Sequence, residues 1–126
     1  VKDDNLELYL MDTNGENIKR LTNNKKVDGN ITWSPDSKKI AFVSQDDEKR
    51  KRSIYFMNVD GTQITKLVGD KYMPSMPRWS PDNNKIAFHM IADDNWEIFV
   101  INIDGSGLTR LTNNDVGDYY PVFRSF

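Results

Sequence analysis

Acidic side chains come closest to a pattern with chemical use in this sequence. Two adjacent carboxylates lie in equivalent loops, at Asp46–Asp47 and Asp93–Asp94, and such pairs can bind Ca²⁺ or act as an acid and a base. Asp60 and Asp104 each precede a glycine, where a hairpin turn also favours aspartate. No spaced Asp-x-Asp-x-Asp loop occurs, so we predict solvated loop and turn residues, with no metal and no cofactor.

His89 is the single histidine. As a general base it would need a nucleophile and an orienting acid, and the sequence identifies neither. It lies in an apolar segment, so a packed or partly buried imidazole is expected. The sequence also lacks Gly-x-Ser-x-Gly and a phosphate-binding glycine loop. We therefore predict no catalytic residue and no enzyme activity for this segment.

These residues belong to an internal repeat with a period of 44–46 residues. Trp-Ser-Pro-Asp at 33–36 recurs at 79–82, Ile-Ala-Phe at 40–42 recurs at 86–88, and an apolar segment ending in Asp-Gly at 57–61 recurs at 101–105. Three leucines each precede the next aromatic residue of the pattern by 12 positions, pairing Leu21 with Trp33, Leu67 with Trp79 and Leu111 with Phe123. The chain thus holds two full repeats and a partial one at each end.

Each repeat contains four short segments rich in β-branched and aromatic residues, separated by turn signals, which is typical of strands. Ile98–Ile101 is apolar at every position, so both faces of its sheet are expected to be buried. A solenoid would bury both faces as well, whereas a two-sheet sandwich would alternate more strictly. We predict an all-β fold of four-stranded antiparallel β-propeller blades, incomplete alone, with eleven strands. The expected units are a partial blade at 1–22, blades at 29–67 and 75–111, and a partial blade at 119–126.

The order Trp-Ser-Pro-Asp, Ile-Ala-Phe, an Ile-Tyr-like strand and Asp-Gly resembles the TolB-type, WD40-like PD40 β-propeller repeat over essentially the whole chain. Family repeats usually carry glycine after Pro-Asp, where this chain has Ser37 and Asn83. The segment at 123–125 lacks the signature and is the weakest match. The resemblance implies a bacterial propeller that docks protein partners over its central channel in the periplasm. Similar repeats form lid propellers of prolyl-oligopeptidase-type enzymes, extracytoplasmic sensor domains and some sugar lyases.

By this resemblance, the loops that enter the first strand of each blade rim the channel mouth. These rim loops span 23–30, 69–76 and 113–120, and their tyrosines and charges differ while the strands stay alike. Tyrosine mixed with charge suits a protein or peptide interface. The predicted partner-binding residues are Lys25, Lys26, Asp28, Tyr72, Arg78, Asp115, Tyr119 and Tyr120. Trp33, Trp79 and Phe123 recur with a strand instead, so we expect them to pack between blades.

The composition of the chain excludes some classes of partner and some kinds of site. The net charge of −2 provides no broad basic field for nucleic acid. Apolar runs stop at four or five residues, far short of the roughly 20 that span a bilayer. The absence of cysteine excludes disulfides and thiolate zinc sites.

Three functions stay open at this point. The first is a non-catalytic interaction or sensing module that binds a protein or peptide at the rim loops, outside the cytoplasm by the resemblance. The second is the propeller portion of a prolyl-oligopeptidase-like hydrolase or a sugar lyase whose chemistry lies outside this segment. The third is a structural repeat unit that self-assembles into a ring. Closed propellers have four to eight blades, so we expect either a longer chain or self-association.

Overall fold

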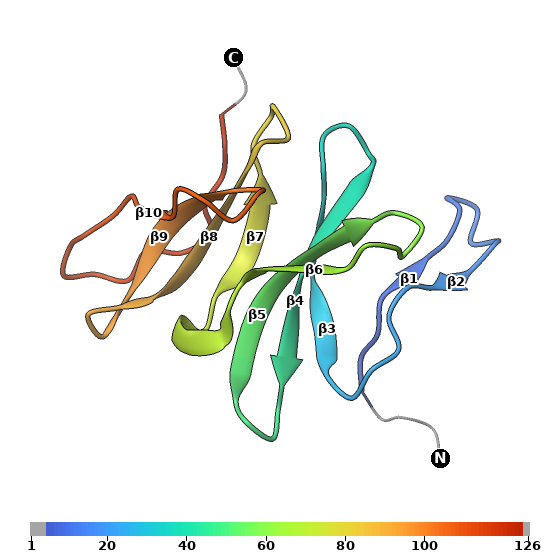
Figure 1. The fold of residues 1–126 in the computed structure, drawn as a ribbon, viewed down its shortest axis with the longest axis horizontal. Coiled ribbons are helices and arrows are strands. Elements are labelled where there is room, and N and C mark those ends of the chain that lie inside the picture. Colours follow the sequence, from blue (N-terminus) through green and yellow to red (C-terminus); the bar gives the residue numbers. More distant parts are fainter. Residues whose placement is uncertain (1–4, 125–126) are drawn as a thin grey trace.

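The structure, a computed structural model, describes residues 5–124, and within them Tyr72 is described by its backbone alone. These residues form ten strands and one short 3₁₀ helix (Figure 1). The elements are β1 (Tyr9–Leu10), β2 (Lys19–Arg20), β3 (Val27–Trp33), β4 (Lys39–Asp46), β5 (Lys51–Asn58), β6 (Thr65–Val68), η1 (Asp70–Tyr72), β7 (Ser75–Trp79), β8 (Lys85–Ala92), β9 (Asn95–Asn102) and β10 (Thr109–Arg110). No helix in residues 5–124 is long and apolar enough to cross a membrane.

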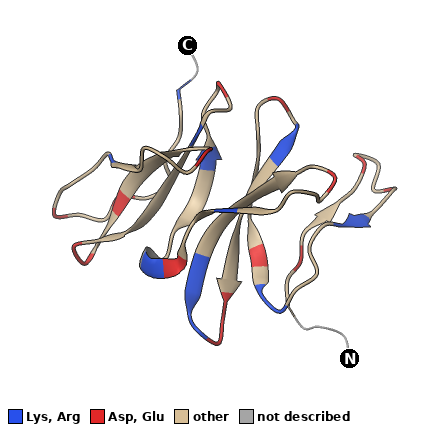
Figure 2. Ribbon diagram, viewed as in Figure 1, with Lys and Arg blue, Asp and Glu red and all other residues tan. Residues whose placement is uncertain are grey.

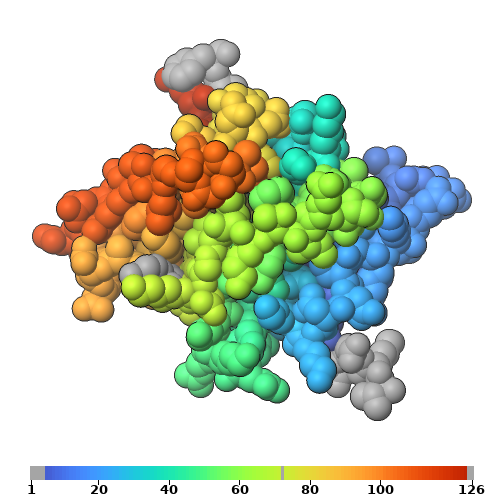
Figure 3. Space-filling model, in the orientation of Figure 1, coloured from blue at the N-terminus to red at the C-terminus, as the bar shows by residue number. Residues whose placement is uncertain are grey.

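The strands form an N-terminal hairpin and two four-stranded sheets. The hairpin pairs β1 with β2, the middle blade has the order β3-β4-β5-β6, and the C-terminal blade has the order β7-β8-β9-β10. All neighbouring strands are antiparallel and consecutive in the chain. Each sheet is thus a meander, as the repeat predicted, and the three units lie in a row along the molecule (Figures 1 and 3).

The Ser-Pro-Asp turns join the first two strands of each blade by the same hydrogen bonds. Ser34 Oγ donates to Asp36 Oδ1 at 2.7 Å and accepts from the Lys39 amide at 2.9 Å. The second copy at 80–85 repeats both bonds. The residue after Pro-Asp has a φ of 59° at Ser37 and 62° at Asn83, a left-handed conformation that glycine adopts without steric cost. This explains why related repeats favour glycine there.

Alternation along β4 buries the middle blade on both faces. Ile40 and Phe42 pack with Leu8 of the hairpin and with Met57. Ala41 and Val43 belong to the second core, which includes Phe88 and Ile86 of the C-terminal blade. Because full burial of one such side chain stabilises a fold by roughly 1.5–3 kcal/mol, these two interfaces hold the three units together.

The tryptophans of the two full repeats differ in environment. Trp79 is 7% exposed, and its Nε1 donates to the carbonyl oxygen of Thr32 at 3.3 Å. It packs between blades as predicted. Trp33 is 48% exposed, so the same prediction is wrong for it in this chain. The reason is that Trp79 rests on the first strand of the preceding blade, and the hairpin that precedes Trp33 has no such strand within the described residues.

The segment around Phe123 also differs from prediction. No strand is assigned at 119–124, and the last two residues of the predicted partial blade lie outside the described residues. Tyr120 nevertheless has a φ of 56°, close to 50° at Asn30 and 51° at Met76, its equivalents in the repeat. Both earlier residues lie where the strand register shifts in β3 and β7, which marks a β-bulge. The segment therefore repeats the backbone φ of the bulged position, although no strand forms in the described part of it.

Candidate functional site

Loops of two kinds meet at one end of the blades. The rim loops enter β3 and β7, and the β4–β5 and β8–β9 loops emerge beside them because the strands alternate in direction (Figure 1). The Ser-Pro-Asp turns lie at the opposite end. Charged residues gather at the loops and strand ends, while the middle of the blades carries few (Figure 2).

The first aspartate of each acidic pair forms an ion pair within its own blade. Asp46 pairs with Lys49 at 3.5 Å, and Asp93 pairs with Arg110 at 2.6 Å. Asp60 accepts hydrogen bonds from the Thr62 amide and hydroxyl, as its equivalent Asp104 does from Ser106, with the following glycines at a φ of 86°. Among the described residues, no group of three or more His, Cys, Asp or Glu could hold a metal.

The predicted partner-binding residues are placed in different environments. Lys25 and Asp115 are exposed. Arg78 is half-buried on β7, and its Nη1 donates to the Pro77 carbonyl oxygen at 2.9 Å. The side chain of Tyr72 lies outside the described residues.

Asp28 is 3% exposed and anchors its loop from inside. Its carboxylate accepts from Ser44 Oγ at 2.5 Å and from Asn24 Nδ2 at 2.7 Å. Lys26, two residues earlier, places its Nζ 5.7 Å from the centre of the Tyr55 ring. Of these two rim residues, only Lys26 presents its charge at a cavity.

Tyr119 and Tyr120 join two residues of the C-terminal blade in an aromatic cluster. The His89 ring lies 5.1 Å from Trp96, 5.4 Å from Tyr119 and 5.8 Å from Tyr120, measured between ring centres. The Tyr120 amide donates to His89 Nδ1 at 3.3 Å. His89 is buried as predicted, whereas the tyrosines are 48% and 62% exposed. Burial first and Arg52 second lower the pKa of His89, so its imidazole is neutral at pH 7.

Buried glutamates form a second feature, which the sequence reasoning missed. Glu97 is fully buried and accepts hydrogen bonds from Thr112 Oγ1, from Arg110 Nη2 at 3.1 Å and from the Asn114 amide at 3.3 Å. The bond from Thr112 is the main reason that the pKa of Glu97 lies below its usual value. The network ties the start of the rim loop at 113–120 to β9.

The hairpin contains the same network two copies earlier in the repeat. Glu7 accepts from Thr22 Oγ1 at 2.5 Å, from Arg20 Nη2 at 3.0 Å and from the Asn24 amide at 2.8 Å. Burial opposes ionisation of Glu7, but these bonds and one from Asn5 outweigh it and lower its pKa. The sequence did contain a signal for this network, a motif that occurs in both units. Asn-x-Glu followed by Arg-Leu-Thr-Asn-Asn stands at 5–7 with 20–24 and at 95–97 with 110–114.

The middle blade lacks this network. In register with the other two repeats, Ser53 stands for the glutamate, Val68 for the threonine and Lys66 for the arginine. A cavity of about 260 Å³ opens at Ser53. We call it the lysine pocket because Lys26, Lys49, Lys51 and Lys66 line it, together with two aspartates and two serines.

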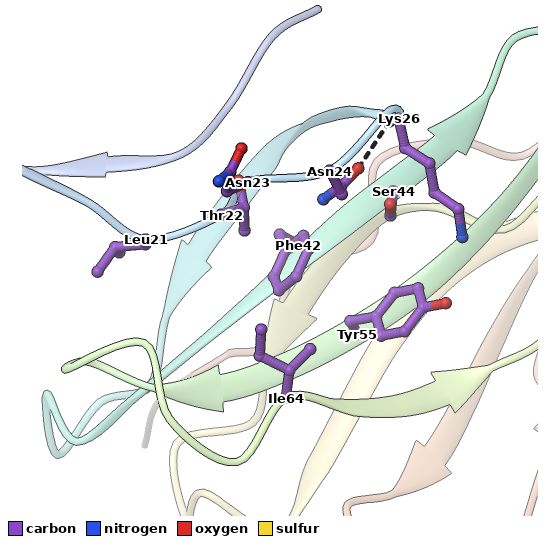
Figure 4. Close-up of a pocket in the computed structure, with 9 residues that line it drawn as sticks. All are labelled: Leu21, Thr22, Asn23, Asn24, Lys26, Phe42, Ser44, Tyr55 and Ile64. Carbon is purple, nitrogen blue, oxygen red and sulfur yellow. Dashed lines mark hydrogen bonds between the residues drawn. The ribbon is translucent and has the colours of Figure 1, made fainter. Parts of the chain in front are cut away.

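A second cavity, of about 250 Å³, adjoins the lysine pocket and shares Lys26 and Ser44 with it. We call it the apolar cleft. Phe42, Tyr55 and Ile64 line it from the middle blade, and residues 21–24 and Lys26 line it from the hairpin side (Figure 4). The Phe42 and Tyr55 rings stack at 5.8 Å with 19° between their planes. A charged pocket and an apolar cleft thus share one inter-unit groove.

A β-propeller is built from four-stranded meanders that stack radially and bury both of their faces. The two four-stranded sheets of this chain have this form, and the first strand of each carries the same bulge. Residues 33–125 match the family described as PD40, TolB beta propeller domain. The chain belongs to this family, as the resemblance predicted. No curated protein sequence matches it.

Solved structures agree with this assignment. A putative TolB from Agrobacterium tumefaciens is 23% identical, with a TM-score of 0.72 over 84% of this chain and 40% of its own. TolB from Acinetobacter baumannii is 26% identical, with a TM-score of 0.72 over 85% of this chain and 26% of its own. An oligogalacturonate lyase from Vibrio parahaemolyticus is 16% identical, with a TM-score of 0.66 over 84% and 29%. The chain thus spans less than half of each.

Proposed function

We propose that the chain is a non-catalytic interaction or sensing module, part of a β-propeller, which binds a protein or peptide partner at its rim loops. The observation that carries this proposal is the pair Tyr119 and Tyr120. Both are about half exposed and rest on the His89 ring, and Tyr119 also contacts Trp96. Rigid, half-exposed tyrosines lose little entropy on binding and are enriched in interface hot spots.

The absence of catalysis is part of the proposal. The His89 ring contacts three aromatic rings, and a backbone amide donates to its Nδ1, which differs from a base held between an acid and a nucleophile. We extend the proposal to a location outside the cytoplasm of a bacterium, which rests on the family alone. A hydrolase or lyase that carries this propeller as one part stays the alternative.

Peptide selection tests the proposal. Peptides selected from a displayed random library on the wild-type chain should bind more weakly to the double variant Tyr119→Ala/Tyr120→Ala, by about tenfold or more, because hot-spot aromatics dominate such interfaces. Tyr9→Ala is the matched control, since Tyr9 is 56% exposed and lies on the hairpin, outside the rim loops. Selected peptides that bind both variants equally would refute the rim as the site.

A further inference from the structure

We propose that the lysine pocket binds a carboxylate of an acidic peptide, and that the apolar cleft receives a neighbouring apolar side chain of the same peptide. This inference rests on the proposed function and names the chemistry of the partner. It places recognition in the groove between the hairpin and the middle blade, apart from the aromatic cluster of Tyr119 and Tyr120.

The repeat itself shows what the pocket lacks. In the other two units, Glu7 and Glu97 put a carboxylate at this position, and donors from the following strand and loop surround it. In the middle blade a buried serine, Ser53, takes that position. The cationic residue persists as Lys66, but no carboxylate stands at the strand position of the glutamate, and the anion that Lys66 attracts is Asp70 of the following loop. A carboxylate from outside can occupy the same place relative to the sheet.

The positive and negative side chains around the lysine pocket do not balance. Lys51 pairs with Asp70 at 3.4 Å and Lys49 pairs with Asp46 at 3.5 Å. Both pairs are solvent-exposed in part, and such pairs are weak and exchangeable. Lys26 and Lys66 each hold Nζ 5.7 Å from the centre of the Tyr55 ring. Four lysines and two aspartates line the pocket, and Asp28, which accepts a hydrogen bond from the lining Ser44, brings a third carboxylate to its wall, so one positive charge is in excess.

A peptide fits the whole groove better than a polyanion does. The lysine pocket is small and continues into the apolar cleft, where Ile64 and Tyr55, which stacks on the buried Phe42, offer an apolar surface. A phosphate backbone would leave this surface unused, and the chain carries a net charge of −2. A carboxylate next to an aromatic or aliphatic side chain matches both halves of the groove at once.

The direct test uses a blocked, fluorescein-labelled peptide of sequence Glu-Glu-Phe-Glu, titrated with the wild-type chain by fluorescence anisotropy. We expect saturable binding that weakens with added salt and is lost for the matching Gln-Gln-Phe-Gln peptide. Lys26→Gln and Lys66→Gln should each weaken binding by about threefold, and the double variant by roughly tenfold. Lys38→Gln, at the Ser-Pro-Asp turn on the opposite end of the blade, is the matched control and should bind like the wild type.

A second variant restores the internal anion. Ser53→Glu, combined with Lys66→Arg and Val68→Thr, rebuilds the network of the other two units. We expect it to fold and to lose peptide binding at least tenfold, because its own carboxylate now fills the pocket. If this triple variant does not fold, the lysine variants alone decide the question.

The outcomes separate this inference from the proposed function. No binding of the acidic peptide, equal binding by Lys66→Gln, or equal competition by a single-stranded DNA 12-mer would overturn the lysine pocket as a peptide site. The rim proposal would still stand if the tyrosine double variant lost its selected peptides. If both the acidic peptide and all selected peptides failed to bind, both proposals would be refuted.

Discussion

At the scale of single residues, the buried glutamates connect local chemistry to the placement of the rim loops. Glu97 is fully buried, yet it stays ionised because its oxygens receive hydrogen bonds from Thr112, Arg110 and the Asn114 amide. The loop that carries Tyr119 and Tyr120 begins at this network. The stability of this loop therefore depends on the ionisation of Glu97.

Thr112→Val tests that dependence. Valine is nearly isosteric with threonine and already stands at the equivalent position as Val68, but it removes the hydroxyl donor to Glu97. We expect a loss of roughly 1–3 kcal/mol in the free energy of unfolding, measured by urea denaturation at pH 7. A change below about 0.5 kcal/mol would mean that the network contributes little.

The glutamates also predict how stability depends on pH. The pKa values of Glu7 and Glu97 are lower in the folded chain than their ordinary value of 4.5. Their contribution is therefore present above pH 4.5 and is lost as pH falls through the lower, folded-state values. Thr112→Val should lose less stability than the wild type on acidification, because its Glu97 pKa lies closer to the ordinary value. Parallel acid profiles for both proteins would contradict this account.

His89 also makes stability fall on acidification, but in a higher pH range and because of burial rather than hydrogen bonds to a carboxylate. Burial lowers its pKa in the folded chain below 6.5. The free energy of unfolding therefore decreases as pH falls below 6.5, because the unfolded chain takes up a proton before the folded chain does. Because the chain has a single histidine, its imidazole resonance can be followed by NMR without assignment by mutation. We expect a midpoint below 6.5, with the Tyr120 amide resonance shifting together with it, since that amide donates to Nδ1. A midpoint at or above 6.5 would show that the ring is solvated.

At the scale of elements, the Ser-Pro-Asp turn explains what the repeat pattern was able to predict. Its serine, aspartate and proline specify the hydrogen bonds and the φ angle of a tight turn, so strand order and sheet membership followed from their spacing. The same pattern says little about side chains between strands. Glu97 looked like one polar residue in a strand, because its partners lie 13 to 17 residues further along the chain.

Ser37→Gly is the prediction that belongs to this element. Ser37 holds a φ of 59°, which costs an L-residue roughly 1–2 kcal/mol and glycine nothing. After the greater entropy of unfolded glycine is subtracted, we expect a gain of roughly 0.5–1 kcal/mol in thermal or urea unfolding. Asn83→Gly should gain less, because Asn83 Oδ1 also accepts a hydrogen bond from the Asp36 amide at 3.1 Å. A loss of stability in Ser37→Gly would show that the serine makes a compensating contact.

At the scale of the whole molecule, the chain is a row of units with unfinished outer faces. Exposed apolar residues occur on the hairpin, where Tyr9 and Met11 are 56% and 62% exposed, and beyond the C-terminal blade, where Val122 is 83% exposed. Sequence periodicity predicted the units and their stacking, since those depend on contacts within the repeat. It did not predict the exposure of Trp33, because that depends on which neighbour is present.

Whether copies of the chain associate to complete a propeller ring can be tested with the matched pair Trp33 and Trp79. They occupy the same place in the repeat, but Trp79 is 7% exposed and Trp33 48%. Trp79→Ala should cost roughly 3–5 kcal/mol of unfolding free energy in any state of assembly. Trp33→Ala should cost less than about 1 kcal/mol in dilute solution, yet weaken association that appears as concentration rises, because the first strand of another blade would cover Trp33. Light scattering at several concentrations, with both variants, measures this difference. A wild-type chain that stays monomeric throughout would argue against self-association and would leave completion to other segments of a longer propeller.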